Sequence, residues 1–208
     1  MATATLKRIL VLGPYSAGLR LAPREFDRAE FAEGWRYELI NGVLVVSPIP
    51  LEQERDPNEE LGHWLRTYRD TNPKATIDRT LSEHTIKTGA NRRRCDRVIW
   101  AGLGRLPRSG ETPTIIAEFV SKGKRDQKRD YEEKRDEYMA IKVQEYWIID
   151  RFQRTMTIFI NQGAGFKKRV IQENQIYTTK LLPGFEVPLA KLLALADDWN
   201  ENNEERET

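Results

Sequence analysis

Residues 114–120 read Thr-Ile-Ile-Ala-Glu-Phe-Val, and this stretch decides the fold of the 208-residue chain. Apart from Thr114 and Glu118 it is continuously apolar, which is typical of a central strand buried on both faces of a sheet. The carboxylate of Glu118 lies inside that run, although burying an isolated charge carries a large free-energy cost. It must therefore be protonated, paired with a cation or bound to a metal.

Further strands and helices are expected on either side of this central strand. Residues 37–46 read Tyr-Glu-Leu-Ile-Asn-Gly-Val-Leu-Val-Val, which predicts a β-hairpin with a type I′ turn at Asn41-Gly42. The remaining apolar patterns predict strands at 80–87, 94–100, 145–149, 155–160 and 167–171, and helices that begin near Pro23 and that cover 57–68, 127–141 and 189–195. With one βαβ crossover, this order predicts an α/β fold with a central mixed sheet, flanking helices and an added hairpin.

Composition limits the classes of protein and of site. The chain has 34 Lys and Arg against 32 Asp and Glu, a net charge of +2, which excludes a strongly basic coat protein but not a local basic face. One cysteine permits no internal disulfide and favours a cytoplasmic setting, and no apolar run is long enough for a membrane helix. One cysteine and two histidines exclude a zinc site of the Cys/His type, so any metal would need oxygen ligands.

The length suits one domain, which we place at residues 21–195. Residues 1–20 are expected to form an N-terminal arm. Residues 196–208 end in a run rich in Glu, Asn and Arg, and this composition predicts a disordered tail.

Three acidic residues stand at strand positions that should be buried: Glu38 in the hairpin, Asp96 at the start of the strand 94–100, and Glu118. Each has an ordinary explanation: Glu38 as a solvated acid, Asp96 as an acid paired with the arginines at 92–94, and Glu118 as half of a buried salt bridge. A shared divalent cation would account for all three, and carboxylates suit Mg²⁺ or Mn²⁺.

One lysine falls in the apolar stripe of a predicted helix. Tyr131, Lys134, Tyr138 and Ile141 share one face of the helix 127–141. Lys134 either extends its ammonium group to the surface, or pairs with Asp130 four residues earlier, or reaches the carboxylates and stabilises charge on a phosphate.

Two basic runs flank the acidic residues in the sequence. Both are either solvated loops or contacts to a phosphate backbone. As nucleic-acid contacts we select Arg93, Arg94, Lys122, Lys124 and Arg125.

The motifs together resemble a known family. They are Arg36-Tyr-Glu-Leu-Ile-Asn-Gly-Val-Leu-Val-Val-Ser-Pro48, Asp96, Glu118-Phe-Val120, Asp130-x-x-x-Lys134-x-x-x-Tyr138, Glu145-Tyr-Trp-Ile-Ile-Asp150 and Leu182-Pro-Gly-Phe185. In this order they are similar to the Uma family of restriction-endonuclease-like proteins, within the PD-(D/E)XK nuclease superfamily, over about residues 21–195.

The resemblance implies a Mg²⁺- or Mn²⁺-dependent endonuclease that hydrolyses phosphodiester bonds, with DNA as its substrate. It also implies that Glu38, Asp96 and Glu118 bind the metal and that these three residues and Lys134 are catalytic. Val120 stands where the superfamily usually has its lysine. Cys95 and Gln53 replace a proline and a histidine that are common in the family.

Two other classes of function are consistent with the same residues. One is a non-catalytic protein of this fold that binds nucleic acid or a protein partner. The other is a structural module, since the apolar residues of the C-terminal hairpin are compatible with a homodimer.

Overall fold

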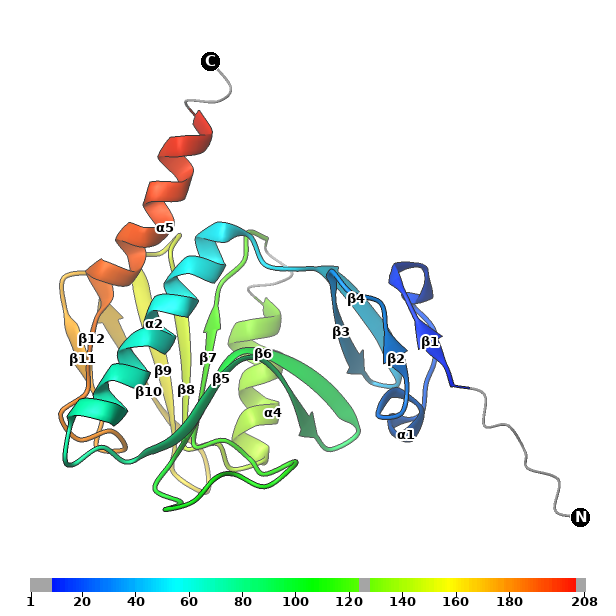
Figure 1. Ribbon diagram of the computed structural model, residues 1–208, viewed down its shortest axis with the longest axis horizontal. Coiled ribbons are helices and arrows are strands. Elements are labelled where there is room, and N and C mark those ends of the chain that lie inside the picture. The colour runs from blue at the N-terminus through cyan, green and yellow to red at the C-terminus, as the bar shows by residue number, and fades with distance from the viewer. Residues whose placement is uncertain (1–8, 124–127, 205–208) are drawn as a thin grey trace, which may run out of the picture. The chain divides into compact units, whose positions relative to one another are not determined.

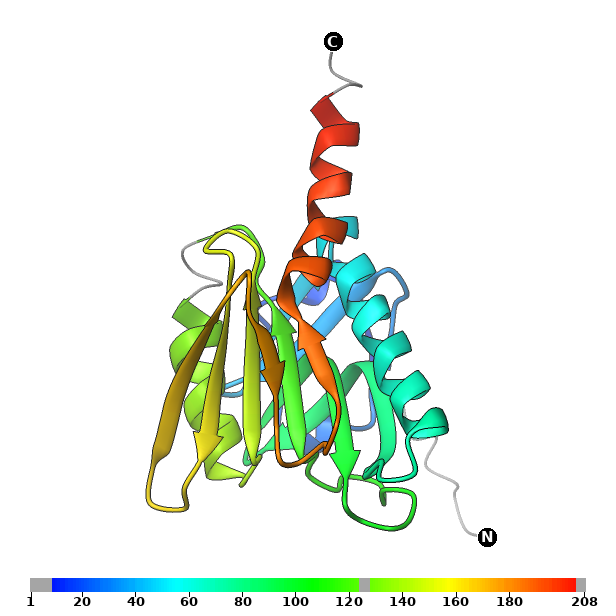
Figure 2. The same cartoon turned by 90° about the vertical axis from the view of Figure 1, so that its left-hand side faces the viewer.

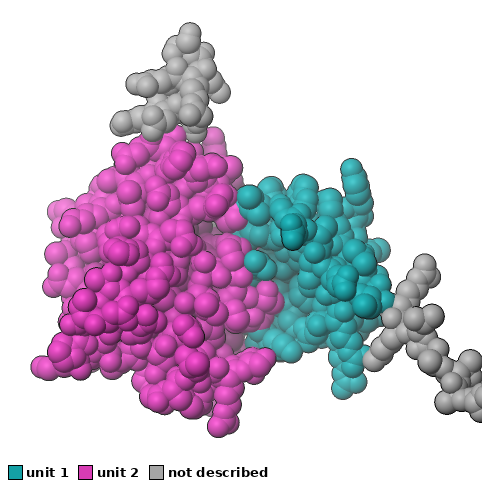
Figure 3. All heavy atoms as spheres, viewed as in Figure 1, with its two compact units in different colours: residues 1–49, 87–94 teal, residues 50–86, 95–208 magenta. Residues whose placement is uncertain are grey.

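The computed structural model describes residues 9–123 and 128–204, and for 200–204 the backbone alone. The chain divides into two compact units (Figure 3), and the domain bounds 21–195 stay a prediction. Unit 1 contains residues 1–49 and 87–94, and unit 2 contains residues 50–86 and 95–208. The strands β5 (Ile77–Thr88) and β6 (Asn91–Ala101) are divided between the units. Their residues within 87–94 belong to unit 1, and their other residues belong to unit 2.

Unit 2 is built on a mixed sheet, as predicted. Its strand order is β10–β9–β8–β7–β6, with β5 paired to β6 (Figure 1). The bounds are β5 Ile77–Thr88, β6 Asn91–Ala101, β7 Ile115–Phe119, β8 Glu145–Asp150, β9 Thr155–Asn161 and β10 Phe166–Gln172. Strands β7 and β8 are parallel, whereas the pairs β6–β7, β8–β9 and β9–β10 are antiparallel.

Helices cover both faces of this sheet (Figures 1 and 2). One face packs against α2 (Glu52–Thr71) and α5 (Leu189–Glu204), and the other against η2, a π-helix (Arg129–Lys134), and α4 (Arg135–Ala140). The side chains of β7 alternate between them: Ala117 and Phe119 enter the core under α2 and α5, whereas Ile116 enters the core under α4. Glu118 follows this alternation and points toward η2 and α4.

Several helix boundaries differ from the predicted ones. α2 begins at Glu52 rather than at residue 57, because Pro57 is accommodated inside the helix. α5 continues to Glu204, so the segment expected to be a disordered tail is helical from 196 to 204. After β10 the chain also forms a small antiparallel pair, β11 (Ile176–Thr178) and β12 (Glu186–Pro188), which the sequence did not predict.

Unit 1 contains the predicted hairpin, formed by β3 (Trp35–Ile40) and β4 (Val43–Pro48). Asn41 and Gly42 have φ of 51° and 74°, which are the positive values that a type I′ turn requires. β3 also pairs with β6, where Leu39 is opposite Arg92.

The helix predicted near Pro23 is only one turn long. α1 spans Pro23–Phe26, and the chain then enters β2 (Glu30–Phe31), which pairs in parallel with β1 (Val11–Leu12). A short 3₁₀ helix, η1 (Pro14–Ser16), lies between β1 and α1 in the sequence. The helix expected to begin near Pro23 therefore ends after one turn, and Phe26 and Ala29 enter the small core of unit 1 from this turn and the residues that follow it.

Candidate active site

Glu118 and Lys134 form a buried ion pair. The Nζ of Lys134 lies 2.9 Å from Oε2 of Glu118, and the two side chains are 3% and 2% exposed. The same Nζ lies 3.1 Å from Oδ1 of Asp130, four residues earlier on η2. The structure therefore contains both the predicted pair with Asp130 and the predicted approach of the ammonium group to a strand carboxylate.

A tyrosine on α4 contacts the other oxygen of Glu118. The hydroxyl of Tyr138 donates to Oε1 of Glu118 at 2.9 Å and accepts from the Cys95 thiol at 3.4 Å. Burial, and then the electrostatic influence of Cys95 and Glu118, raise the pKa of Tyr138 well above its usual value. Tyr138 is therefore a hydrogen-bond donor, and Cys95 is a buried residue with a free thiol.

The π-helical turn helps to align these side chains. A π-helix has wider turns than an α-helix, and short π-helical segments are frequent at functional sites. Asp130 and Lys134 lie four residues apart across this turn, and Tyr138 lies four residues further along α4. The hydroxyl of Tyr146 on β8 donates to the carbonyl oxygen of Asp130 at 3.0 Å, which ties the start of η2 to the sheet.

Asp96 lies on the strand next to Glu118. The register pairs Arg97 with Ala117, so Asp96 and Glu118 occupy the next positions on β6 and β7. Oδ2 of Asp96 accepts from the backbone N–H of Phe119 at 2.7 Å, and Asp96 is 6% exposed. Asp96 therefore lies inside unit 2, with its carboxylate directed at β7.

A buried polar group anchors α2 beside Asp96. The Nε of Arg97 donates to Oδ1 of Asn58 at 2.7 Å, and its Nη2 donates to the Asn58 carbonyl oxygen at 2.7 Å. The Nδ2 of Asn58 in turn donates to the carbonyl oxygen of Asp96 at 2.9 Å. Burial lowers the pKa of Arg97 to about 10, so its guanidinium remains charged at neutral pH.

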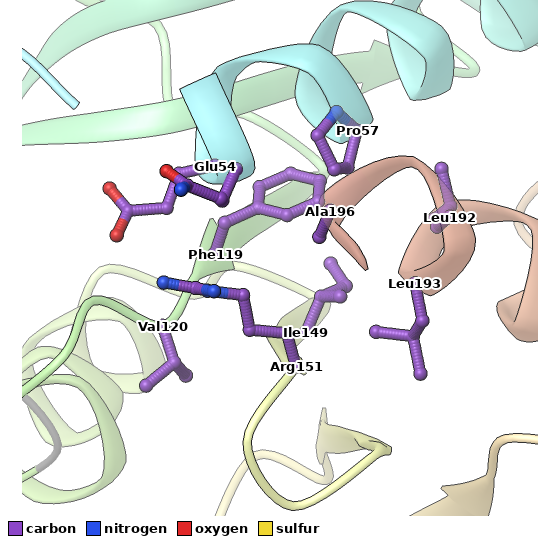
Figure 4. A pocket seen from close by; sticks show the side chains of 10 residues that line it. Glu54, Pro57, Phe119, Val120, Ile149, Arg151, Leu192, Leu193 and Ala196 are labelled. Carbon is purple, nitrogen blue, oxygen red and sulfur yellow. The ribbon is translucent and has the colours of Figure 1, made fainter. Parts of the chain in front are cut away.

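Glu54 lies one turn before Asn58 on α2, and sequence reasoning missed it. It is 6% exposed, and burial, followed by the charge of Asp96, raises its pKa to about 7. A hydrogen bond with Ser121 and the charge of Arg151 oppose that rise. Glu54 and Arg151 also line a small pocket (Figure 4). In that view the carboxylate of Glu54 and the guanidinium of Arg151 extend to the same side, opposite to Leu192 and Leu193 of α5.

A signal for Glu54 was present in the sequence. It shares the inward face of α2 with Leu61, Leu65 and Tyr68 at helical spacing, as Lys134 shares a face with two tyrosines. Placing the start of the helix at Pro57 excluded Glu54 from that stripe.

Glu38, the remaining predicted ligand, belongs to unit 1. Its Oε1 accepts from the backbone N–H of Arg94 at 3.0 Å, and it is 7% exposed, so it is not a solvated acid. Asp96 and Glu118 belong to unit 2, and the grouping of Glu38 with them stays a prediction.

The predicted nucleic-acid contacts have different environments. Arg93 is buried, with 1% exposure, Arg94 is half-buried, and Lys122 is exposed. Lys124 and Arg125 lie outside the described residues. Among the described residues of this set, only Lys122 is exposed to solvent, and the role of the set stays a prediction.

The donor chemistry at Asp96 and Glu118 suits a hard divalent cation. Two carboxylates on neighbouring strands offer oxygen ligands, and Mg²⁺ usually keeps several waters beside one or two protein carboxylates. In the described part of the chain, no three His, Cys, Asp or Glu side chains gather closely enough to hold a metal ion. Asp96 and Glu118 are therefore two candidate oxygen ligands of the type that Mg²⁺ or Mn²⁺ prefers.

The fold defines a class of protein. A mixed sheet covered by helices on both faces is the architecture of restriction-endonuclease-like nucleases, in agreement with the expectation from the sequence. The family model described as "Uma2: Putative restriction endonuclease" matches residues 23–194. The chain belongs to this family, a family of nucleases.

A solved structure supports the fold. The chain is similar to a crystal structure from Anabaena variabilis ATCC 29413, titled as a putative nuclease belonging to DUF820, with a TM-score of 0.68 and 16% sequence identity. The match covers 85% of this chain and 99% of the other. No curated protein matches the chain. Across the described residues, no helix has the length and apolar character needed to cross a membrane.

Proposed function

We propose that this protein is a metal-dependent endonuclease that hydrolyses phosphodiester bonds in DNA. One observation supports this most directly. Two buried carboxylates, Asp96 and Glu118, lie on neighbouring strands, and the ammonium group of Lys134 lies 2.9 Å from Glu118. Oxygen ligands beside a fixed cation are what metal-assisted attack on a phosphate needs.

The roles follow from the chemistry of each group. Asp96 and Glu118 would hold Mg²⁺ or Mn²⁺, with Glu38 as a further predicted ligand. A bound divalent cation supplies Lewis-acid stabilisation of negative charge on the phosphate. Lys134 would stabilise charge that develops on the same phosphate, and Asp130, 3.1 Å from its Nζ, holds the ammonium group in place.

The substrate would be held through its backbone charges. Lys122 is exposed and follows β7 by three residues, so it lies close in sequence to Glu118. Together with Arg94, Lys124 and Arg125 it is suited to contact phosphates, and such contacts are independent of sequence. Binding should therefore weaken as the salt concentration rises.

A cleavage panel tests the proposal. Single-stranded, double-stranded and branched DNA, with RNA for comparison, would be incubated with Mg²⁺ or Mn²⁺ and either wild type or Asp96→Ala. We expect metal-dependent cleavage by the wild type and none by a folded Asp96→Ala variant. If the wild type binds DNA equally with and without Mg²⁺ and never cuts it, the protein is a binding module; if it does neither, it is a structural module.

A further inference from the structure

The carboxylate of Glu118 has a separate donor on each of its oxygens. Lys134 contacts Oε2 at 2.9 Å, and the Tyr138 hydroxyl donates to Oε1 at 2.9 Å. The terminal torsion of a glutamate is broad and is not fixed by rotamer preference alone. One donor would leave the carboxylate plane free to turn, whereas donors on both oxygens define that plane.

We infer that Tyr138 is a positioning residue for Glu118, and that it sets the orientation in which this carboxylate meets a divalent cation. The inference rests on the proposed function, because it concerns the same site. In this role Tyr138 contacts neither the phosphate nor the metal. It acts through Glu118, in the way that outer hydrogen bonds orient metal ligands in general.

The placement of Tyr138 supports this role. The residue is fully buried, and its hydroxyl accepts from Cys95, the residue directly before Asp96. A single hydroxyl therefore contacts the neighbour of one proposed ligand in β6 and the other proposed ligand in β7. A change at this oxygen should therefore act directly on the carboxylate of Glu118.

The competing interpretation is that Tyr138 is a core residue whose hydroxyl merely finds a partner. Tyr177 provides a control for it. Tyr177 is also buried, with 2% exposure, and its hydroxyl likewise donates to a buried carboxylate, lying 2.9 Å from Oε2 of Glu145. Glu145 is not among the proposed metal ligands.

The experiment compares wild type, Tyr138→Phe and Tyr177→Phe. The Kd of Mn²⁺ would be measured by calorimetry, kcat and KM on the best DNA substrate by initial rates, and folding by thermal unfolding. Each variant removes one buried hydroxyl that donates to a carboxylate and keeps the ring, so both should lower Tm by similar amounts. Tyr138→Phe should also raise the Kd of Mn²⁺ about 10-fold and lower kcat with little change in KM, whereas Tyr177→Phe should retain the wild-type Kd.

Equal effects of the two variants on Mn²⁺ binding, or no effect of either, would overturn the positioning role and leave the proposed function standing. If the wild type itself neither binds Mn²⁺ nor cleaves DNA, the proposed function fails and the positioning role fails with it. The wild-type measurement therefore separates the two failures.

Discussion

The ammonium group of Lys134 lies 2.9 Å from the carboxylate of Glu118, and neither side chain is more than 3% exposed. The two charges come from different elements, a π-helix and a central strand, and their mutual attraction offsets part of the cost of burying them. Asp130 gives the lysine a second acidic partner. The pair therefore has a structural consequence as well as the proposed chemical one.

Removing the lysine should destabilise the protein strongly. In Lys134→Met, Glu118 and Asp130 stay buried without their cation, and the free energy of unfolding should fall by about 3–5 kcal/mol. Urea unfolding measures this. Lys128→Met is the control, because Lys128 is exposed at the start of the same helix. A loss for Lys134→Met no larger than for Lys128→Met would contradict the buried pair.

A methyl group at Gly62 should disturb the contact between α2 and β6. A Cβ built at Gly62 would lie 2.5 Å from Nη1 of Arg97, whose guanidinium is held by Asn58. Although alanine favours helices over glycine, we expect Gly62→Ala to lower the free energy of unfolding by roughly 1–3 kcal/mol. Gly165→Ala, where nothing lies within 4 Å, is the matched control in chemical denaturation. Unchanged stability of Gly62→Ala would show that Arg97 moves freely.

The stability of the protein should depend on the ionisation of Glu54. Burial and the charge of Asp96 raise its pKa from 4.5 to about 7 in the folded protein. The contribution is therefore fully present below pH about 4.5 and is lost as the pH rises through about 7, by up to roughly 3 kcal/mol. Glu54→Gln removes this dependence.

The measurement is the free energy of unfolding of wild type minus that of Glu54→Gln, as a function of pH. This difference should decrease from about pH 4.5 to about pH 7 and then level off. Glu52→Gln, at an exposed position in the same turn of α2, is the control variant and should change the free energy of unfolding less than Glu54→Gln does. A pH-independent difference for Glu54→Gln would contradict the raised pKa.

In unit 1, Asp27 should act in the opposite direction. Its carboxylate lies 2.6 Å from Nε of Arg92 and 3.1 Å from Nζ of Lys87, and the hydrogen bond with Arg92 lowers its pKa to about 2. The stabilisation is present above the ordinary pKa of 3.8 and is lost as the pH falls toward 2.

Since Asp27 is partly exposed, solvent screening limits the effect, and Asp27→Asn should cost only about 1 kcal/mol at neutral pH. Thermal unfolding at neutral pH and at about pH 3 checks this, with a smaller loss expected at the lower pH. Asp70→Asn, at an exposed carboxylate that pairs with the adjacent Arg69, serves as the control and should change stability less. A larger loss of stability at about pH 3 than at neutral pH would contradict the lowered pKa of Asp27.

Local chemistry explains which parts of the fold were predictable. The Asn41-Gly42 turn and the apolar run around Glu118 each determine a conformation within a few residues, and both appear as predicted. The helix predicted to begin near Pro23 is only one turn long, because Phe26 and Ala29 can reach the same core from a turn as well as from a longer helix. β11 and β12 are only three residues each and pair with each other, so neither is long enough to show a clear alternating pattern in the sequence.

The candidate site was predictable to the same degree. Glu118 and Lys134 stood out because each is a charge in an otherwise apolar pattern, and the structure brings these two together. The contact of Asp96 with the backbone of β7 depends on strand register, which no local pattern specifies. Glu54 was missed because a proline within the helix suggested a later start.

The proposed nuclease activity depends above all on Asp96 and Glu118 holding one divalent cation. The most direct test is calorimetric titration of Mn²⁺ into the wild type and the variants Asp96→Asn and Asp78→Asn. Asp78→Asn is the control, because the carboxylate of Asp78 accepts a hydrogen bond from the backbone N–H of Leu103 and is not a proposed ligand. We expect one binding event in the wild type, the same event in Asp78→Asn, and none in Asp96→Asn. Absence of binding in the wild type, or equal binding in Asp96→Asn, would contradict the account.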